Sequence, residues 1–259
     1  MGEFVRLEVQ DGVGTIRLDR PKMNAIDAAL TQELRDAALE ATAREDVRAV
    51  VLWGGERVFA AGADIKEMSS QTYAEMVSYG TSLQETFKAI ARIPMPVVAA
   101  VNGYALGGGF ELALTADFRV LGTKSQVGLP EILLGVIPGA GGTQRLTRLV
   151  GPAKAKGMIF SGRFVKAEEA VALGIADEVV DDADVYGAAV AMAQRFASGP
   201  AIALRSAKQA VDDGLELPLD AGLRLETTLF TGLFATEDQT AGMASFIENG
   251  PGKAVFSGR

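Results

Sequence analysis

Residues 97–113 have the sequence VVAAVNGYALGGGFELA, in which a short apolar run leads through a glycine-rich turn into a helical segment. The apolar run predicts a buried strand. Gly107, Gly108 and Gly109 are costly in conformational entropy, so they indicate a sharp bend that exposes backbone N–H groups at the start of a helix. The helix dipole favours developing negative charge at that point. Glu111 falls in the first turn of the predicted helix.

A phosphate-binding loop is the main alternative for this turn. No Gly-Lys-Ser or Gly-Lys-Thr follows it, and the spacing is not Gly-x-Gly-x-x-Gly, so a nucleoside triphosphate site is not expected. Close packing of helix against strand is the other alternative. In that case Glu111 would be a solvated partner of the helix dipole, which is the commoner situation for a single glutamate.

The rest of the first two hundred residues alternates strand and helix patterns. Residues 4–9 and 13–18 predict a β-hairpin around Asp11-Gly12, and 49–53 and 118–121 predict further strands. Asp27 is a plausible N-cap for a helix that places Leu30, Leu34, Ala38 and Ala41 on one face. Strands separated by helices favour right-handed crossovers and a mostly parallel sheet, so the fold class is α/β.

Helical patterns dominate after about Lys166. They cover 183–198, 200–213, 218–234 and 237–248, with little strand signal between them. Gly199-Pro200 is the expected boundary. We therefore predict a core at 1–199 that contains the active site and a C-terminal helical region at 200–259.

Composition excludes several kinds of chemistry. The 259 residues include no cysteine and no histidine, so thiolate nucleophiles, Ser–His–Asp triads and sites ligated by Cys or His are absent, and no metal site is expected. Acid–base work then falls to Asp, Glu, Lys or Tyr. The formal net charge of −8 disfavours a nucleic-acid partner. The sequence shows no secretion signal and no apolar stretch long enough to cross a membrane, so a cytoplasmic location is expected.

Two further segments could carry chemistry. FAAGADIKEM at 59–68 follows a predicted strand, and its small residues would let a ligand approach the backbone, although a tight strand-to-helix loop is the plain alternative. Glu131 lies among apolar residues, where loss of solvation would raise its pKa and suit it to proton transfer. Alternatively, Glu131 caps a short helix or pairs with Arg145.

Together these segments resemble the crotonase (enoyl-CoA hydratase/isomerase) superfamily. The similar strings are AAGADIKEM at 60–68, NGYALGGGFELA at 102–113 and PEILLGVIPGAGGTQRL at 130–146, with weaker similarity at 18–26 and 234–248. The resemblance implies a crotonase-type spiral of ββα units followed by a C-terminal helical trimerisation region. It also implies a homotrimer, or a hexamer built as a dimer of trimers.

The resemblance also implies a set of site residues. Ala63 and Gly108 match the two N–H donors of an oxyanion hole for a thioester carbonyl, Glu111 and Glu131 match the two hydratase glutamates, and Gly139 matches a glycine beside the water. Coenzyme A is part of the acyl-CoA substrate and no separate cofactor is implied. Its expected contacts are Lys22, Ala61, Ala63, Asp64, Ile65, Lys66 and Gly108.

The implied activity is hydration of a 2-trans-enoyl-CoA to a 3-hydroxyacyl-CoA, as in the β-oxidation of fatty acids. Retention of both glutamates favours a hydratase over a double-bond isomerase, which can work with one carboxylate. Two alternatives stay open: another crotonase-type acyl-CoA reaction, such as enoyl-CoA isomerisation, and a non-catalytic or RNA-binding relative.

Overall fold

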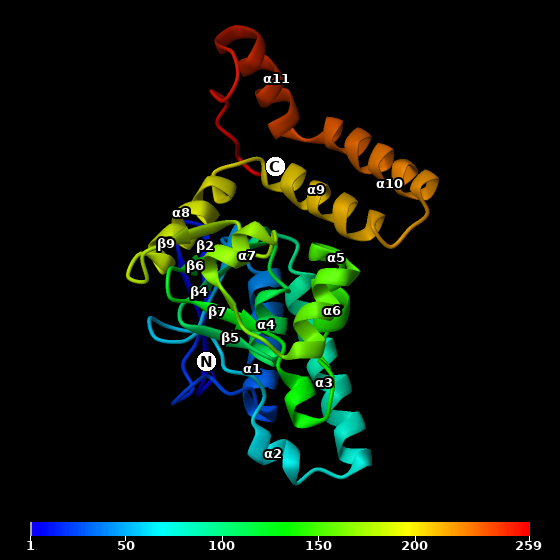
Figure 1. The fold of residues 1–259 in the computed structure, drawn as a ribbon. Coiled ribbons are helices and arrows are strands. Elements are labelled where there is room, and N and C mark those ends of the chain that lie inside the picture. The colour runs from blue at the N-terminus through cyan, green and yellow to red at the C-terminus, as the bar shows by residue number, and fades with distance from the viewer. Residues whose placement is uncertain (1) are drawn as a thin grey trace.

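A six-stranded sheet forms the centre of the computed structural model, which describes residues 2–259 (Figure 1). The strand order is β1-β2-β3-β4-β6-β9. Strands β1 (Val5–Gln10) and β2 (Val13–Leu18) form the predicted antiparallel hairpin, and every later pairing in this sheet is parallel. The later strands are β3 (Ala49–Trp53), β4 (Val97–Val101), β6 (Phe118–Gly122) and β9 (Glu178–Val180).

Helices cover both faces of this sheet, which explains why its central strands are continuous apolar runs. Val50 and Leu52 of β3 pack into the core that includes α1 (Ala28–Ala43) and α3 (Tyr73–Ala91). Val51 points to the opposite face, where α8 (Val185–Ala197) covers the sheet. Asp27 caps α1 as predicted, because its side chain accepts a hydrogen bond from the Leu30 N–H.

A smaller three-stranded sheet lies beside the glycine-rich turn. It contains β5 (Tyr104–Leu106), β7 (Gln126–Gly128) and β8 (Val165–Lys166). The short helices around it are α2 (Ile65–Ser69), α4 (Gly108–Ala113), the 3₁₀ helix η1 (Glu131–Leu134), α5 (Gly142–Val150), α6 (Pro152–Ser161) and α7 (Ala167–Ala172). Strands β5, β7, β8 and β9 were not predicted, since two or three residues are too few to show a periodic pattern.

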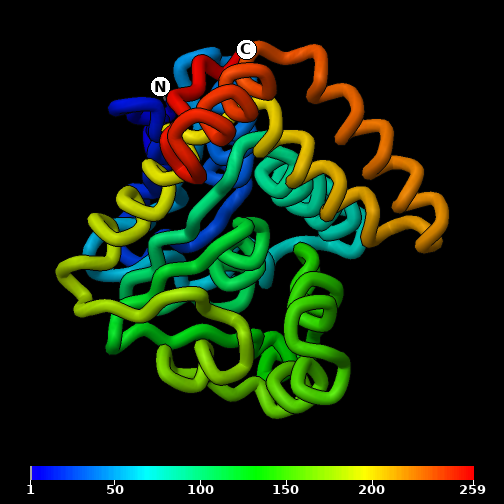
Figure 2. Tube along the Cα trace, turned by 90° about the horizontal axis from the view of Figure 1, so that it is seen from above, coloured from blue at the N-terminus to red at the C-terminus, as the bar shows by residue number. Residues whose placement is uncertain are grey.

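The C-terminal helices extend from this body. They are α9 (Ala201–Gly214), α10 (Leu219–Gly232), the 3₁₀ helix η2 (Leu233–Ala235) and α11 (Glu237–Asn249). Figure 2 shows α9 and α10 side by side, projecting away from the sheets. Asp238 is the only residue of these four helices that is buried. Lys208 joins α9 to the core, since its Nζ lies 2.8 Å from Asp117 Oδ2. Among residues 2–259 no helix is both long and apolar enough to span a membrane.

Candidate active site

Two backbone segments approach each other at the start of α4. The Ala60 N–H donates to the Tyr104 carbonyl, and the Leu106 N–H donates to the Ala60 carbonyl, both at 3.1 Å. Residues 60–63 therefore run beside the glycine-rich turn. A Cβ built on Gly109 would lie 2.0 Å from the Ala60 oxygen, so only glycine allows this close approach. At Gly107 the backbone turns with φ of 51°, which also favours glycine.

The N–H groups of Ala63 and Gly108 lie close together at this junction. A Cβ built on Gly108 would lie 3.6 Å from the Ala63 nitrogen. Gly108 is the first residue of α4, where backbone donors have no acceptor within the helix. Neither N–H donates to another group among residues 2–259. Two neighbouring N–H groups without acceptors could bind an oxygen that gains negative charge.

Glu111 is held rigidly by the second glycine-rich turn. Its Oε1 accepts hydrogen bonds from the N–H groups of Ala140 and Gly142, both at 2.8 Å. The residue is only 2% exposed. Burial raises the pKa of the carboxyl, although these two donors act in the opposite direction. Because Oε1 already accepts two hydrogen bonds, Oε2 is the oxygen left to exchange a proton or bind water.

Glu131 has a carboxyl group without hydrogen-bond partners among residues 2–259. Both of its oxygens are inaccessible to solvent and accept no hydrogen bond from any residue between 2 and 259, so it does not pair with Arg145. Burial raises the pKa of this carboxyl to about 7, and the charge of Glu111 adds to the increase. A buried carboxyl without a partner is stable only when neutral, so it carries a transferable proton near neutral pH.

The two glutamates and the two donors belong to one region. A Cβ built on Gly107 would lie 3.2 Å from Glu131 Oε1, which places the Glu131 carboxyl beside Gly107, the residue before Gly108. Glu111 is near enough for its charge to act on Glu131. Two carboxyl groups with raised pKa values therefore lie beside a pair of backbone donors, an arrangement suited to adding or removing a proton next to a carbonyl group.

Gly139 lies in the same turn that holds Glu111. Its carbonyl accepts a hydrogen bond of 2.8 Å from Gln84 Nε2 of α3. A Cβ built on Gly139 would meet no atom within 4 Å, so there is open space beside it. Sequence reasoning did not identify Gln84, because nothing in the helical pattern of α3 distinguishes it from other polar residues.

Most of the residues expected to contact coenzyme A lie at 61–66, on both sides of Ala63, whereas Lys22 and Gly108 come from other segments. Ile65, Lys66 and Lys22 are exposed, and Ala61 is half-buried. The Asp64 side chain is engaged within the protein: Oδ1 caps α2 and Oδ2 accepts from Arg20, so a ligand could reach only its backbone. Arg20 was also not identified, although it lies within the weakly similar string at 18–26.

One family model and several known proteins are similar to nearly the whole chain. The model described as "Enoyl-CoA hydratase/isomerase" matches residues 8–259. A protein of Rhizobium meliloti (strain 1021) named "Probable enoyl-CoA hydratase" is 47% identical over 247 residues, which cover 95% of each chain. A protein of Mycolicibacterium paratuberculosis with a similar name is 43% identical and covers 91% of this chain and 93% of its own length.

Solved structures show the same fold. The crystal structure of an enoyl-CoA hydratase from Bacillus anthracis matches with a TM-score of 0.94 at 35% identity, covering 99% of this chain and 100% of the other. An enoyl-CoA hydratase from Thermoplasma volcanium matches with a TM-score of 0.85 at 31% identity, covering 95% of this chain and 97% of the other.

Proposed function

This chain belongs to the enoyl-CoA hydratase/isomerase family, and we propose that it catalyses the reversible syn addition of water to a 2-trans-enoyl-CoA, giving a 3-hydroxyacyl-CoA. The observation that carries this proposal is the convergence of Glu111 and Glu131 beside the N–H groups of Ala63 and Gly108, which donate to no acceptor within residues 2–259. The enzyme is thus a hydro-lyase whose thioester substrate brings coenzyme A with it.

The backbone donors stabilise the negative charge that develops on the substrate during the reaction. Addition of water at C3 moves the π electrons of the C2–C3 double bond toward the thioester, and negative charge develops on its oxygen. The N–H groups of Ala63 and Gly108 hydrogen-bond that oxygen. Loss of one such donor typically costs about 2.7–4 kcal/mol of transition-state stabilisation.

The glutamates account for the proton transfers. Glu111 Oε2 removes a proton from the attacking water while Oε1 stays fixed by Ala140 and Gly142. Glu131, whose pKa is raised by burial to about 7, gives its proton to C2. The new C3–O and C2–H bonds replace the π bond, and transfer of the proton from Glu111 back to Glu131 through solvent completes the cycle.

Glu111→Gln and Glu131→Gln test this division of labour. Each should lower kcat by about 10²–10⁴-fold, the range for loss of a general acid or base, with little change in coenzyme A binding. The assay follows loss of crotonyl-CoA absorbance together with formation of 3-hydroxybutyryl-CoA, and Glu8→Gln on exposed β1 is the control. Near-wild-type turnover in both variants would refute these roles. A wild type that shifts 3-enoyl double bonds without hydration would instead be an isomerase.

Gly108→Ala tests the oxyanion hole separately. The added methyl would lie 3.6 Å from the Ala63 nitrogen and 3.7 Å from Ile26 Cδ1, which are ordinary contacts, so the fold should be retained. The methyl would occupy space beside both donors. We expect kcat to fall by about 10²-fold with little change in melting temperature. Unchanged kcat would exclude the Gly108 N–H as a donor.

We also propose that the protein acts as a homotrimer or a dimer of trimers, in the cytoplasm, within fatty-acid β-oxidation. Support for assembly comes from the C-terminal helices, whose large apolar side chains are extensively exposed in the single chain. Such a surface is typical of a protein–protein interface. The exposed residues are Leu219, Leu223, Phe230, Phe234, Met243, Phe246 and Ile247. Light scattering coupled to gel filtration measures the assembly; a monomer would contradict it.

A further inference from the structure

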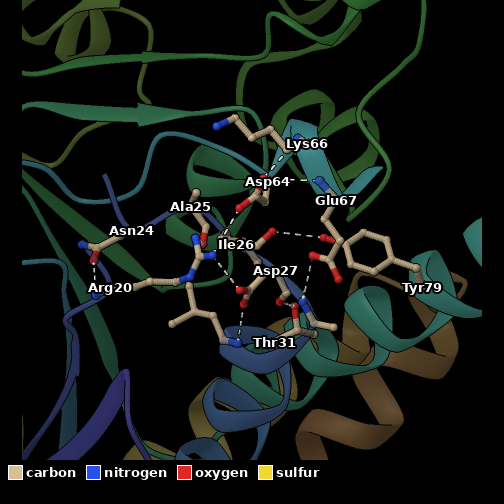
Figure 3. A network of polar contacts seen from close by, with 12 residues as sticks. Arg20, Asn24, Ala25, Ile26, Asp27, Thr31, Asp64, Lys66, Glu67 and Tyr79 are labelled. Carbon is tan, nitrogen blue, oxygen red and sulfur yellow. Dashed lines mark hydrogen bonds and ion pairs between the residues drawn. The ribbon is translucent and has the colours of Figure 1, made fainter. Parts of the chain in front are cut away.

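Arg20 joins two aspartates that lie 37 positions apart in the sequence. Its Nη2 lies 2.8 Å from Asp27 Oδ2 and 3.2 Å from Asp64 Oδ2, and its Nη1 donates to the Ala25 carbonyl at 2.9 Å. The three charged side chains are only 20%, 18% and 24% exposed. Figure 3 shows the Arg20 guanidinium between the two carboxylates. Partial burial makes such pairs stronger than the exposed pairs on the rest of the surface.

Both aspartates also cap helices, and in each of them one carboxylate oxygen accepts from the helix and the other contacts Arg20. Asp27 Oδ1 accepts from the Leu30 N–H of α1 at 2.8 Å. Asp64 Oδ1 accepts from the Lys66 and Glu67 N–H groups of α2 at 3.1 and 3.4 Å. In each case Oδ2 is left for Arg20. Arg20 therefore fixes the start of α2 against the start of α1.

Ala63 lies directly before the Asp64 cap. The peptide groups on either side of it are bonded to Ile26: the Ile26 N–H donates to the Gly62 carbonyl at 2.8 Å, and the Asp64 N–H donates to the Ile26 carbonyl at 2.9 Å. The Tyr79 hydroxyl of α3 donates to the same Ile26 carbonyl at 3.1 Å. Ala63 is thus held through its neighbours, while its own N–H finds no acceptor in the part of the chain that the structure describes.

We propose that Arg20 is a positioning residue for catalysis, which through Asp64 aims the Ala63 N–H at the thioester oxygen. This inference rests on the proposed role of Ala63. Asp64 belongs to the Ala63–Asp64 peptide, one peptide group away from the Ala63 N–H, so the Arg20–Asp64 ion pair resists a backbone rotation at Asp64 that would also turn Ala63. Preorganised donors stabilise developing charge because they need no reorientation during the reaction.

Arg20→Gln and Asp64→Asn each remove the ion pair. Asparagine caps helices about as well as aspartate, so Asp64→Asn keeps the α2 cap and removes only the charge. We expect each variant to lower kcat by about 10- to 100-fold, less than outright loss of a donor, with KM changed little. The double variant should be no worse than the more damaged single variant, because both remove one interaction.

Asp27→Asn is the matched control. It also removes a carboxylate that pairs with Arg20 Nη2 and also leaves a helix cap, but it does not adjoin Ala63. Its kcat should stay within about twofold of the wild type, as expected for a lost ion pair away from the reacting atoms. An equal loss of kcat in Asp27→Asn would overturn the proposal, because Arg20 would then act through general anchoring.

A spectroscopic measurement separates positioning from stability. The ultraviolet band of a 3-aryl-2-enoyl-CoA moves to longer wavelength when hydrogen bonds polarise its carbonyl, and rapid mixing records it before turnover. We expect a smaller shift in Arg20→Gln and Asp64→Asn than in Asp27→Asn. A full shift in both ion-pair variants, or wild-type kcat in both, would overturn the proposal. If Arg20→Gln does not fold, the kcat and the band shift of Asp64→Asn alone test the proposal.

Failure of this proposal is distinguishable from failure of the proposed function. If the wild type shows neither hydration nor a band shift, the oxyanion hole itself is wrongly assigned. If the wild type shows both and the ion-pair variants match it, the function stands and Arg20 has no positioning role.

Discussion

Replacing Glu131 with glutamine should make the melting temperature of the protein less sensitive to alkaline pH. Burial raises the pKa of Glu131 from 4.5 to about 7, and both carboxyl oxygens lack hydrogen-bond partners among residues 2–259. The folded state therefore binds this proton more tightly than the unfolded chain does. The resulting stabilisation is fully present below pH 4.5 and is lost as pH rises through about 7.

The size of the effect follows from the two pKa values. At about 1.36 kcal/mol per pKa unit, ionisation of Glu131 in the folded state costs up to about 3.4 kcal/mol. Part of the side chain reaches solvent, and screening reduces this to about 1–2 kcal/mol. For a chain of this size that corresponds to roughly 2–8 °C in melting temperature. Glu131→Gln has no proton to lose, so it should keep this amount of stability at alkaline pH.

Thermal melting followed by circular dichroism at about pH 5.5 and about pH 8.5 measures the effect. The quantity to compare between the two pH values is the melting temperature of the variant minus that of the wild type. A cost of burying the glutamine amide that does not depend on pH cancels in this comparison. Protein concentration must be fixed, because assembly makes melting temperature depend on it. Glu8→Gln, which removes one exposed charge, is the control. A variant-minus-wild-type difference that is the same at both pH values would refute the assignment of Glu131 as a buried acid.

Two other predictions concern the close contact at Gly109 and the ion pair that joins α9 to the core. Gly109→Ala should destabilise the fold by about 2–3 kcal/mol, because the methyl would lie 2.0 Å from the Ala60 oxygen. Gly80→Ala, in open space on α3, should instead stabilise it by about 0.5–1 kcal/mol, and urea titrations that gave equal effects would contradict the packing described here. Lys208→Met should cost about 3 kcal/mol, since it leaves Asp117 partly buried without its cation. A loss below about 0.5 kcal/mol in the same titration would show that this pair does not hold α9 to the core.

Local patterns in the sequence predicted most of the secondary structure. The hairpin at 4–18, the strand at 49–53 and the four late helices appear within a few residues of their predicted positions. Asp27 caps α1 as expected, because capping needs only a side chain and the next few N–H groups. The missed strands β5, β7, β8 and β9 pair with segments distant in the sequence and are too short to leave a periodic signal of their own.

The candidate site, too, was predictable from the sequence only in part. The sequence alone determined that acid–base chemistry must come from side chains other than Cys and His, and that Glu111 lies in the first turn of a helix that follows a glycine-rich turn. It left open whether Glu131 pairs with Arg145. Only the tertiary structure decided that both Glu131 oxygens are buried without a partner from residues 2–259, that Glu111 is held by a turn about thirty residues away, and that Arg20 joins two helix caps. The reason is physical: helix and turn formation depends on neighbours along the chain, whereas burial and charge pairing depend on which distant segments pack together.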